Sequence, residues 1–134
     1  MGDETKRVLE DAKTIAVVGL SDNPGRTSYH VAKYMQEQGY KIIPVNPTIK
    51  EALGEKAYSC LQDVEEKVDI VDVFRRSEDV PPVAEGAIAI GAKCLWLQLG
   101  IVNEEAASRA KSAGLDVVMD HCIMIEHRRV SEEE

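Results

Sequence analysis

The chain has 134 residues, of which 44% are hydrophobic, and its 24 acidic residues outnumber its 16 basic residues to give a formal net charge of −8. This length and composition predict a single globular domain spanning residues 1–134, and they exclude a collagen-like repeat, a disulfide-rich scaffold and a disordered chain. The negative charge disfavours sequence-independent binding to polyanions, so we expect no nucleic-acid partner.

The sequence shows no signal for a membrane or for secretion. Apolar stretches such as Ile15–Leu20 are far shorter than the ~20 residues needed to cross a bilayer. The acidic start, Met1–Glu4, is not followed by the apolar core of a signal peptide. The three cysteines are odd in number and widely spaced, which is typical of reduced thiols and not of a disulfide or a zinc site. We therefore expect a cytoplasmic protein without a membrane partner.

Strands and helices alternate along the whole chain. Continuous apolar runs rich in β-branched residues predict buried strands, and apolar residues at helical spacing predict amphipathic helices. The predicted strands are residues 14–19, 41–45, 69–74, 94–99 and 116–119. The predicted helices are residues 4–12, 27–38, 59–67, 80–88, 103–113 and 122–128, and an acidic tail covers about 130–134. Residues 48–58 form the least regular part of the pattern.

Capping residues mark where several of these helices begin. Thr27 or Ser28 is expected to cap the helix that follows the first strand, and Asn103 the helix that follows the fourth. Ser59 is expected to form a capping box with Gln62 at the start of the helix over residues 59–67.

Five buried strands separated by helices predict an α/β fold with a parallel sheet between two layers of helices. With right-handed crossovers, we expect a Rossmann-type, doubly wound, three-layer α/β/α arrangement with strand order 3-2-1-4-5. In such sheets, ligands bind beyond the carboxyl ends of the strands, near the point where the winding reverses. This rule selects four segments, residues 19–28, 46–50, 74–77 and 98–101.

The first of these segments has the composition of an anion site. It joins a strand to a helix through Gly19, so backbone N–H groups are expected at the positive end of a helix. Arg26 adds a guanidinium suited to phosphate, and hydroxyl groups are supplied by Ser21, Thr27 and Ser28. We therefore predict that this turn binds phosphate, although its residues would also serve a simple turn and helix cap.

The kind of nucleotide is indicated by the end of the second strand. The turn lacks the G-x-G spacing of the dinucleotide fingerprint. An NAD site usually has a carboxylate after the second strand, but here Val45 is followed by Asn46 and Pro47, with Lys50 just beyond. This pattern disfavours NAD and leaves NADP or another phosphorylated nucleotide open. The segment also lacks a Walker lysine, which argues against P-loop hydrolysis.

The other two segments offer fewer signals. Arg75 and Arg76 follow the third strand, and one of them is expected to face the crevice because adjacent residues alternate in direction. Gly100 would let the backbone approach a ligand. The histidines and Asp120-His121-Cys122 form no convincing catalytic or metal-binding set, so we predict neither an enzyme nor a metal site.

Several runs in order resemble the small stand-alone CoA-binding proteins of bacteria and archaea. These proteins are similar in fold to the N-terminal CoA-binding domain of the succinyl-CoA synthetase alpha subunit. The resemblance covers residues 5–129, and it is carried by Ala16–Ser21, Gly39-Tyr40, Val45–Pro47, Val71–Arg75 and Trp96–Gly100.

The resemblance implies a role for each segment. The turn comprising Gly19, Leu20, Ser21, Arg26, Thr27 and Ser28 would bind the phosphates of coenzyme A. Asn46, Pro47 and Lys50 would lie near the adenosine and its 3′-phosphate. The rest of the crevice and the path of the pantetheine arm would be lined by Phe74, Arg75, Leu97, Gln98 and Leu99.

The resemblance does not imply ligase activity. The synthetase carries its phosphorylated histidine in a second domain, and this chain is expected to end before such a domain. We therefore expect a module that binds CoA or an acyl-CoA without catalysis of its own, with a protein partner needed for chemistry at the thiol. The alternatives are a small NADP-dependent oxidoreductase and a regulatory interaction module with a vestigial nucleotide site.

Overall fold

The computed structural model describes residues 2–132, so Met1 and the predicted tail residues Glu133 and Glu134 lie outside the described part. The main sheet is formed by β1 (Thr14–Val18), β2 (Lys41–Val45), β5 (Ile70–Val73), β6 (Cys94–Leu97) and β7 (Asp116–Met119), and a separate hairpin by β3 (Glu51–Ala52) and β4 (Glu55–Lys56). The helices are α1 (Gly2–Asp11), α2 (Thr27–Glu37), α3 (Val80–Ala89), α4 (Glu104–Ser112) and α5 (Ile123–Glu132), with 3₁₀ helices η1 (Leu61–Asp63) and η2 (Ser77–Asp79).

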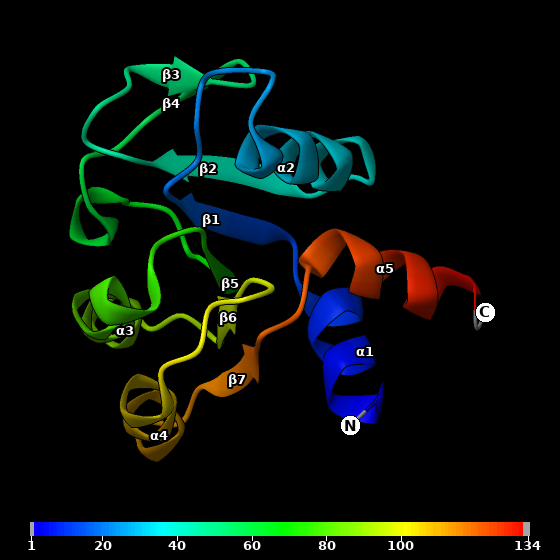
Figure 1. Cartoon of the computed structure of the whole chain (residues 1–134), viewed down its shortest axis with the longest axis vertical. Coiled ribbons are helices and arrows are strands. Elements are labelled where there is room, and N and C mark those ends of the chain that lie inside the picture. The colour runs from blue at the N-terminus through cyan, green and yellow to red at the C-terminus, as the bar shows by residue number, and fades with distance from the viewer. Residues whose placement is uncertain (1, 133–134) are drawn as a thin grey trace.

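The five main strands form an all-parallel, doubly wound sheet, which confirms the predicted fold class. Both faces are covered by helices, as Figure 1 shows. Buried residues of α3 and α4 join one hydrophobic cluster, and those of α1, α2 and α5 join the other. The architecture is therefore three-layered, and the central strands β5 and β6 are buried along their whole length, whereas the edge strand β7 is mostly half-buried.

The predicted strand order is wrong. The sheet runs β2-β1-β5-β6-β7, which is 2-1-3-4-5 when its strands are numbered along the chain, and not 3-2-1-4-5. The chain between β2 and β5 covers the outer edge of β2, because Tyr58 donates to Pro44 O at 3.0 Å and accepts from Asn46 N at 2.8 Å. With that edge occupied, β5 pairs with β1 instead. The winding therefore reverses between β1 and β5.

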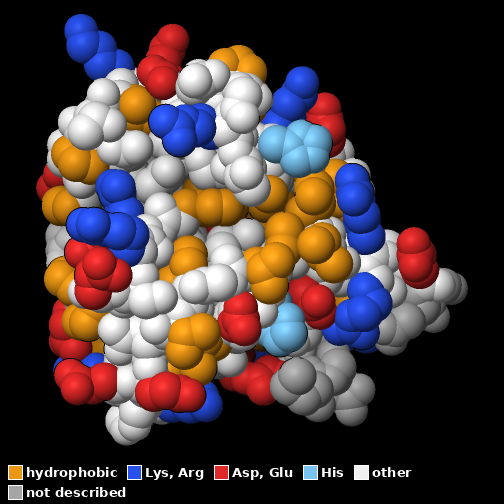
Figure 2. Space-filling view, in the orientation of Figure 1, with side chains coloured by type: hydrophobic (Ala, Val, Ile, Leu, Met, Phe, Trp, Pro, Cys, Tyr) orange, Lys and Arg blue, Asp and Glu red, His pale blue; other side chains and the backbone are white. Residues whose placement is uncertain are grey.

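The surface in Figure 2 is mixed in character. Charged side chains of both signs are spread over it, and hydrophobic side chains gather where the β6–α4 loop meets the start of α5. Within residues 2–132, no helix combines the length and the apolar character that crossing a membrane requires.

Candidate functional site

The carboxyl ends of β1, β2 and β5 are bonded together at the switch point. Gly19 N donates to Val45 O at 2.9 Å, and Phe74 N donates to Val18 O at 2.8 Å. Gly19 has φ +90°, and a Cβ at this position would lie 2.2 Å from Phe74 O. Only glycine fits here, since any side chain would clash with the backbone that leaves β5. The β1–α2 loop and the segment after β5 therefore form adjacent walls.

The β1–α2 loop is ordered by its own side chains. Ser28 Oγ accepts from Ser21 N at 3.0 Å, Ser21 Oγ accepts from Asn23 N at 3.0 Å, and Asn23 Oδ1 accepts from Gly25 N at 2.9 Å. The predicted cap at Thr27 or Ser28 is wrong, because the N-cap of α2 is Arg26 and the Ser28 hydroxyl is used by the loop.

The start of α2 is suited to an anion. No side chain caps it, and its first turn contains no acidic residue. The N–H groups of the first turn and the positive end of the helix dipole therefore face the cleft without a competing carboxylate from the helix itself.

Asn46 connects the loop after β1 with the loop after β2. Its side chain is 8% exposed. Nδ2 donates to Leu20 O at 3.1 Å, and Oδ1 accepts from Thr48 N at 3.0 Å and from Thr48 Oγ1 at 2.8 Å. The amide is thus held by the protein on both sides, and its role is to position the two loops.

These elements surround a cleft of about 800 Å³, which we call the polar cleft. It contains eight of the predicted site residues: Gly19, Ser21, Arg26, Thr27, Ser28, Asn46, Phe74 and Arg75. Two cations, Arg26 and Arg75, therefore lie on the same cleft, whereas Arg76 is turned to Asp79 at 3.2 Å. The sequence did not single out four further lining residues, Asp22, Gly25, Thr48 and Ile49. Only their position in the sequence could have indicated these four residues, since they lie within the segments 19–28 and 46–50 that follow the carboxyl ends of strands.

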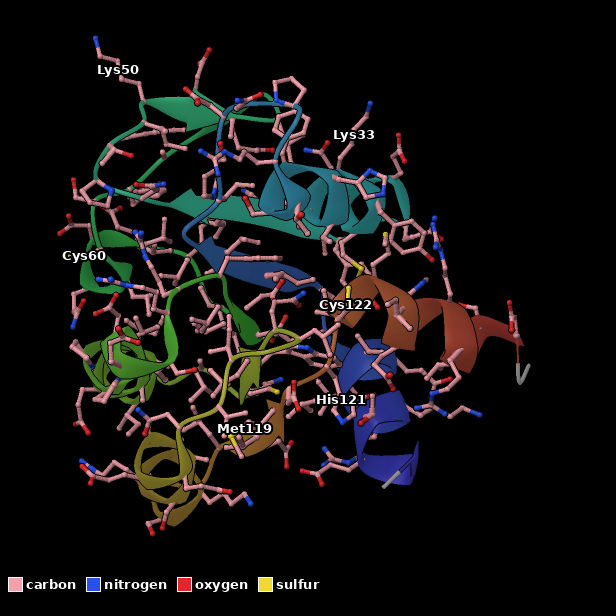
Figure 3. The ribbon with its side chains drawn as sticks, viewed as in Figure 1. Lys33, Lys50, Cys60, Met119, His121 and Cys122 are labelled. Atoms are coloured by element: carbon pink, nitrogen blue, oxygen red, sulfur yellow. The ribbon has the colours of Figure 1, made fainter. Side chains whose placement is uncertain are left out.

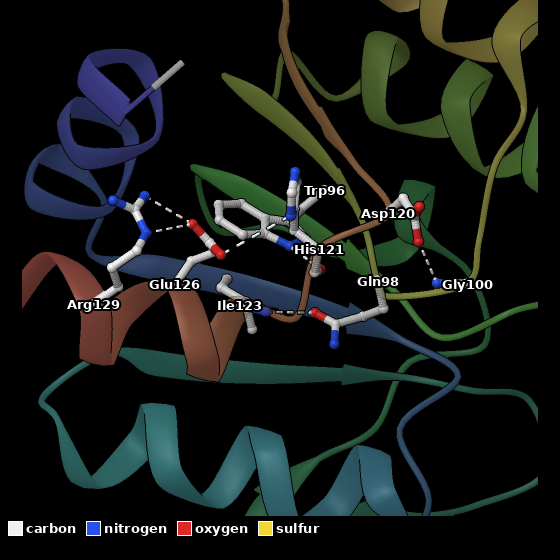
Figure 4. Close-up of polar contacts among 8 residues, drawn as sticks. All are labelled: Trp96, Gln98, Gly100, Asp120, His121, Ile123, Glu126 and Arg129. Atoms are coloured by element: carbon white, nitrogen blue, oxygen red, sulfur yellow. Dashed lines mark hydrogen bonds and ion pairs between the residues drawn. The ribbon is translucent and has the colours of Figure 1, made fainter.

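The remaining predicted site residues lie outside the polar cleft. Leu20 and Leu97 have 0% exposure and pack in the core. Lys50 is exposed, and in Figure 3 it projects away from the sheet beside the β3–β4 hairpin. Gln98 is 4% exposed and uses Oε1 to accept from Ile123 N at 3.1 Å (Figure 4). Leu99 is 66% exposed, so it is not a core residue.

A second cavity lies on the α3 side of the same sheet edge and has a volume of about 350 Å³. We call it the apolar cavity. It shares Arg75 with the polar cleft, and its Pro47 directly follows Asn46. Its apolar walls are formed by Val18, Val45, Pro47, Leu61, Pro82 and Val83. A polar and an apolar compartment thus meet at the carboxyl ends of β1 and β2.

The residues that the sequence excluded from catalysis are scattered. Cys60 and Cys122 lie on well-separated parts of the molecule in Figure 3, and His30 is exposed on α2. His127, which looked solvated in the sequence, instead receives a 2.8 Å hydrogen-bond contact between Nδ1 and Tyr34 Oη. In the part of the chain that the structure describes, no group of three His, Cys, Asp or Glu residues could hold a metal ion.

Comparison with known proteins identifies the family. The model of the family described as "CoA binding domain" matches residues 13–128. The chain belongs to this CoA-binding domain family. The matched residues include the whole of the polar cleft and of the apolar cavity.

Relatives of this CoA-binding domain occur alone and within larger enzymes. The uncharacterized protein YneT of Bacillus subtilis (strain 168) is 55% identical over 124 residues, which are 92% of each chain. The structure of a hypothetical protein from Pyrococcus horikoshii OT3 has a TM-score of 0.94 at 38% identity, covering 98% of this chain and 92% of that one. The ADP-forming acetate–CoA ligase of Methanocaldococcus jannaschii is 32% identical over 91 residues, which are 68% of this chain and 13% of the ligase.

Proposed function

We propose that the chain binds coenzyme A or an acyl-CoA across the polar cleft and the apolar cavity, and that it has no catalysis of its own. The observation that carries the proposal is the convergence of the β1–α2 loop, the uncapped start of α2 and two arginines on one cleft at the switch point. Membership of the CoA-binding domain family supports the choice of ligand.

In this proposal the diphosphate of CoA lies in the polar cleft. The N–H groups at the start of α2 donate to its oxygens, and the guanidinium groups of Arg26 and Arg75 supply charge-assisted hydrogen bonds. Asp22 also borders the cleft and contributes a negative charge, so the two arginines are needed to keep the local potential favourable for an anion.

The adenine ring is assigned to the apolar cavity. A purine is planar and largely apolar on its faces, and the walls formed by Pro47, Leu61 and Val83 suit such a group. β2 is followed by Asn46 and not by a carboxylate, which favours a ribose that carries a phosphate. Lys50 as a partner of the 3′-phosphate stays a prediction.

The absence of catalysis is part of the proposal. The described residues that line the polar cleft include no histidine, cysteine or lysine. The Ser21 and Ser28 hydroxyl oxygens each accept a hydrogen bond from the loop backbone, so these groups organise the loop instead of acting as activated nucleophiles.

Calorimetric titration of the wild type and of Arg26→Ala with CoA, 3′-dephospho-CoA, NADP and NAD tests the proposal. We expect CoA to bind most tightly and Arg26→Ala to weaken it by about 1.5–3 kcal/mol, because a charge-assisted contact is lost. Lys33→Ala is the matched control, since Lys33 is an exposed cation on the same helix that does not line the cleft.

Two outcomes would contradict the proposal. Binding of NADP without binding of CoA would favour an oxidoreductase, and binding of none of the four compounds would favour a regulatory module with a vestigial site. A thermal-unfolding series gives an independent measure, since a ligand at a hundred times its dissociation constant should add about 2.7 kcal/mol of stability.

A further inference from the structure

The polar cleft is lined by the ends of β1 and β2 on one side and by Phe74 and Arg75 after β5 on the other, and the proposed function has so far assigned a ligand group only to the side of β2. CoA carries its adenosine on one side of the diphosphate and its pantetheine arm with the thioester on the other. If the adenine occupies the apolar cavity beside β2, the pantetheine arm leaves toward β5 and β6. The following inference rests on that proposed function and concerns the surface reached by the far end of the arm.

That surface is apolar and exposed. Of the described residues, three large hydrophobic side chains are exposed, and two of them, Leu99 at 66% and Ile125 at 50%, belong to the β6–α4 loop and the first turn of α5. Figure 2 shows hydrophobic side chains gathered where these two segments meet. We call this surface the α5 patch, and we define it by Phe74, Leu99, Cys122, Met124 and Ile125.

Hydrogen bonds on both sides of Leu99 hold the two segments together. The Gln98 Oε1 atom accepts from Ile123 N at 3.1 Å, and the Asp120 Oδ1 atom accepts from Gly100 N at 2.7 Å (Figure 4). Leu99 is therefore fixed beside the start of α5 by the residues before and after it. The exposed Leu99 side chain therefore belongs to a loop whose backbone is held in place by hydrogen bonds.

The α5 patch is continuous with the polar cleft through Phe74. Phe74 lines the cleft, and it packs against the same hydrophobic cluster as Cys122 and Met124. Val73 pairs with Leu97 across β5 and β6, so Phe74 and the residues leading to Leu99 leave neighbouring strands side by side. A ligand that follows this edge out of the cleft passes directly onto the patch.

Charge beside the patch restricts what it can accept. Asp120 is exposed and lies between the β6–α4 loop and α5. The Glu126 carboxylate is paired with Arg129 at 2.8 Å. Arg128, one turn beyond Ile125 on α5, has its guanidinium over the Tyr34 ring at 5.0 Å. An acyl group that ends in a carboxylate would meet the negative charge of Asp120 and would lose solvation against leucine and isoleucine.

We propose that the site selects CoA thioesters of uncharged, apolar acyl groups, whose hydrocarbon chain lies on the α5 patch. The physical basis is the hydrophobic effect: the acyl chain and the side chains of Leu99 and Ile125 shield one another from water. Acetyl-CoA is too short to gain from this contact, and a dicarboxylic acyl group is disfavoured by charge.

The test is a calorimetric titration of the wild type with CoA, acetyl-CoA, hexanoyl-CoA and succinyl-CoA. Burying a methylene fully is worth about fourfold in affinity, so a chain half covered by the patch should gain about twofold per methylene. Hexanoyl-CoA, with four methylenes more than acetyl-CoA, is therefore expected to bind about fifteenfold more tightly, and succinyl-CoA no more tightly than acetyl-CoA.

A pair of variants connects the chain-length effect to the patch. Ile125→Ser should reduce the ratio of hexanoyl-CoA to acetyl-CoA affinity at least threefold. Val102→Ser should preserve the ratio, because Val102 is an exposed apolar residue of the same loop whose backbone is bonded to Ser77 on the other side. Both positions are exposed, and thermal unfolding checks that each variant is folded.

The outcomes separate this inference from the proposed function. Equal affinity for all four compounds, or tightest binding of succinyl-CoA, would overturn the acyl preference while leaving CoA binding intact. An unchanged ratio in Ile125→Ser would remove the assignment to the α5 patch. Failure of every CoA compound to bind would overturn both proposals.

Discussion

Asp72 is a carboxyl group in the middle of the sheet. It lies on β5 between Val17 of β1 and Trp96 of β6, its side chain is 1% exposed, and its Oδ1 atom has no hydrogen-bond partner among the described residues. Burial raises the pKa of Asp72 well above its ordinary value. The charged form is disfavoured because a carboxylate there would be neither solvated nor paired.

We expect Asp72→Asn to stabilise the protein at neutral pH. The unfolded chain releases the Asp72 proton near pH 4 and the folded chain only at higher pH, so the wild type loses stability as the pH rises above about 4. The variant lacks this loss. Its advantage in the free energy of unfolding should therefore grow with pH, by at most about 1.4 kcal/mol per unit, and should shrink toward zero below pH 4.

Urea unfolding of the two proteins between pH 4 and 8 measures this difference. Asp63→Asn is the matched control, since it removes the same charge from an exposed position and separates the effect of burial from that of net charge. A difference that is constant over the pH range would mean that Asp72 is not the group responsible.

At the scale of single elements, sequence patterns located the five strands and five of the six helices. The helix predicted over residues 59–67 is wrong, because only the 3₁₀ helix η1 (Leu61–Asp63) forms there. Ser59 and Gln62 do not form the predicted capping box, because η1 starts after Cys60 and has no side-chain cap. Asn103 does cap α4, with Oδ1 accepting from Ala106 N at 2.9 Å. The Ser28 hydroxyl shows how such a local rule can fail, because it accepts from Ser21 N instead of capping α2.

The β3–β4 hairpin shows a different limit. It lies within residues 48–58, which carried no regular pattern, and its turn places Leu53 at φ 54° and Gly54 at φ 77°. Two successive positive φ angles are typical of a type I′ hairpin turn, which usually contains Asn-Gly or Asp-Gly. A leucine in this position gives no sequence signal, so the hairpin could not be predicted.

The Asn46 side chain stabilises the arrangement of two strands, because it connects the loop after β1 with the loop after β2. We expect Asn46→Ala to lower the free energy of unfolding by about 1–3 kcal/mol, since the Leu20 carbonyl and the Thr48 N–H lose their partner. Asn46→Asp should be more damaging, because it places a carboxylate oxygen against the Leu20 carbonyl. Both variants should also weaken CoA binding.

Urea unfolding and CoA titration measure both effects. Asn23→Ala serves for comparison: it removes one hydrogen bond, to Gly25 N, from an exposed part of the β1–α2 loop, and should change stability by less than about 0.5 kcal/mol. If Asn46→Asp were as stable as the wild type, the side chain could not hold the two loops as described.

At the scale of the whole molecule, the order of the strands was the feature that local patterns could not supply. Each strand was visible from its own residues, but its neighbour in the sheet depends on Tyr58, which covers the edge of β2. The position of the polar cleft could be predicted nonetheless, because the carboxyl ends of the strands meet at one edge of the sheet in either order. Individual residues were less predictable: Leu20, Leu97 and Gln98 are buried and do not line the cleft, because the direction of a side chain near a strand end was not apparent from the sequence.

Addition of CoA is expected to change hydrogen exchange at the carboxyl edge of the sheet and not at its amino edge. If CoA binds at the carboxyl edge, its addition should slow exchange in residues 20–28, 46–50 and 74–77, because these loops open less often when they hold the ligand. The amino edge contains its own cavity of about 320 Å³, which includes Gly39 and Tyr40, and should not respond. Mass spectrometry of peptides from both edges, with and without CoA, makes the comparison within one molecule. Protection around Gly39 and Tyr40 without protection of residues 20–28 would move the binding site to the wrong edge and contradict the role of Arg26.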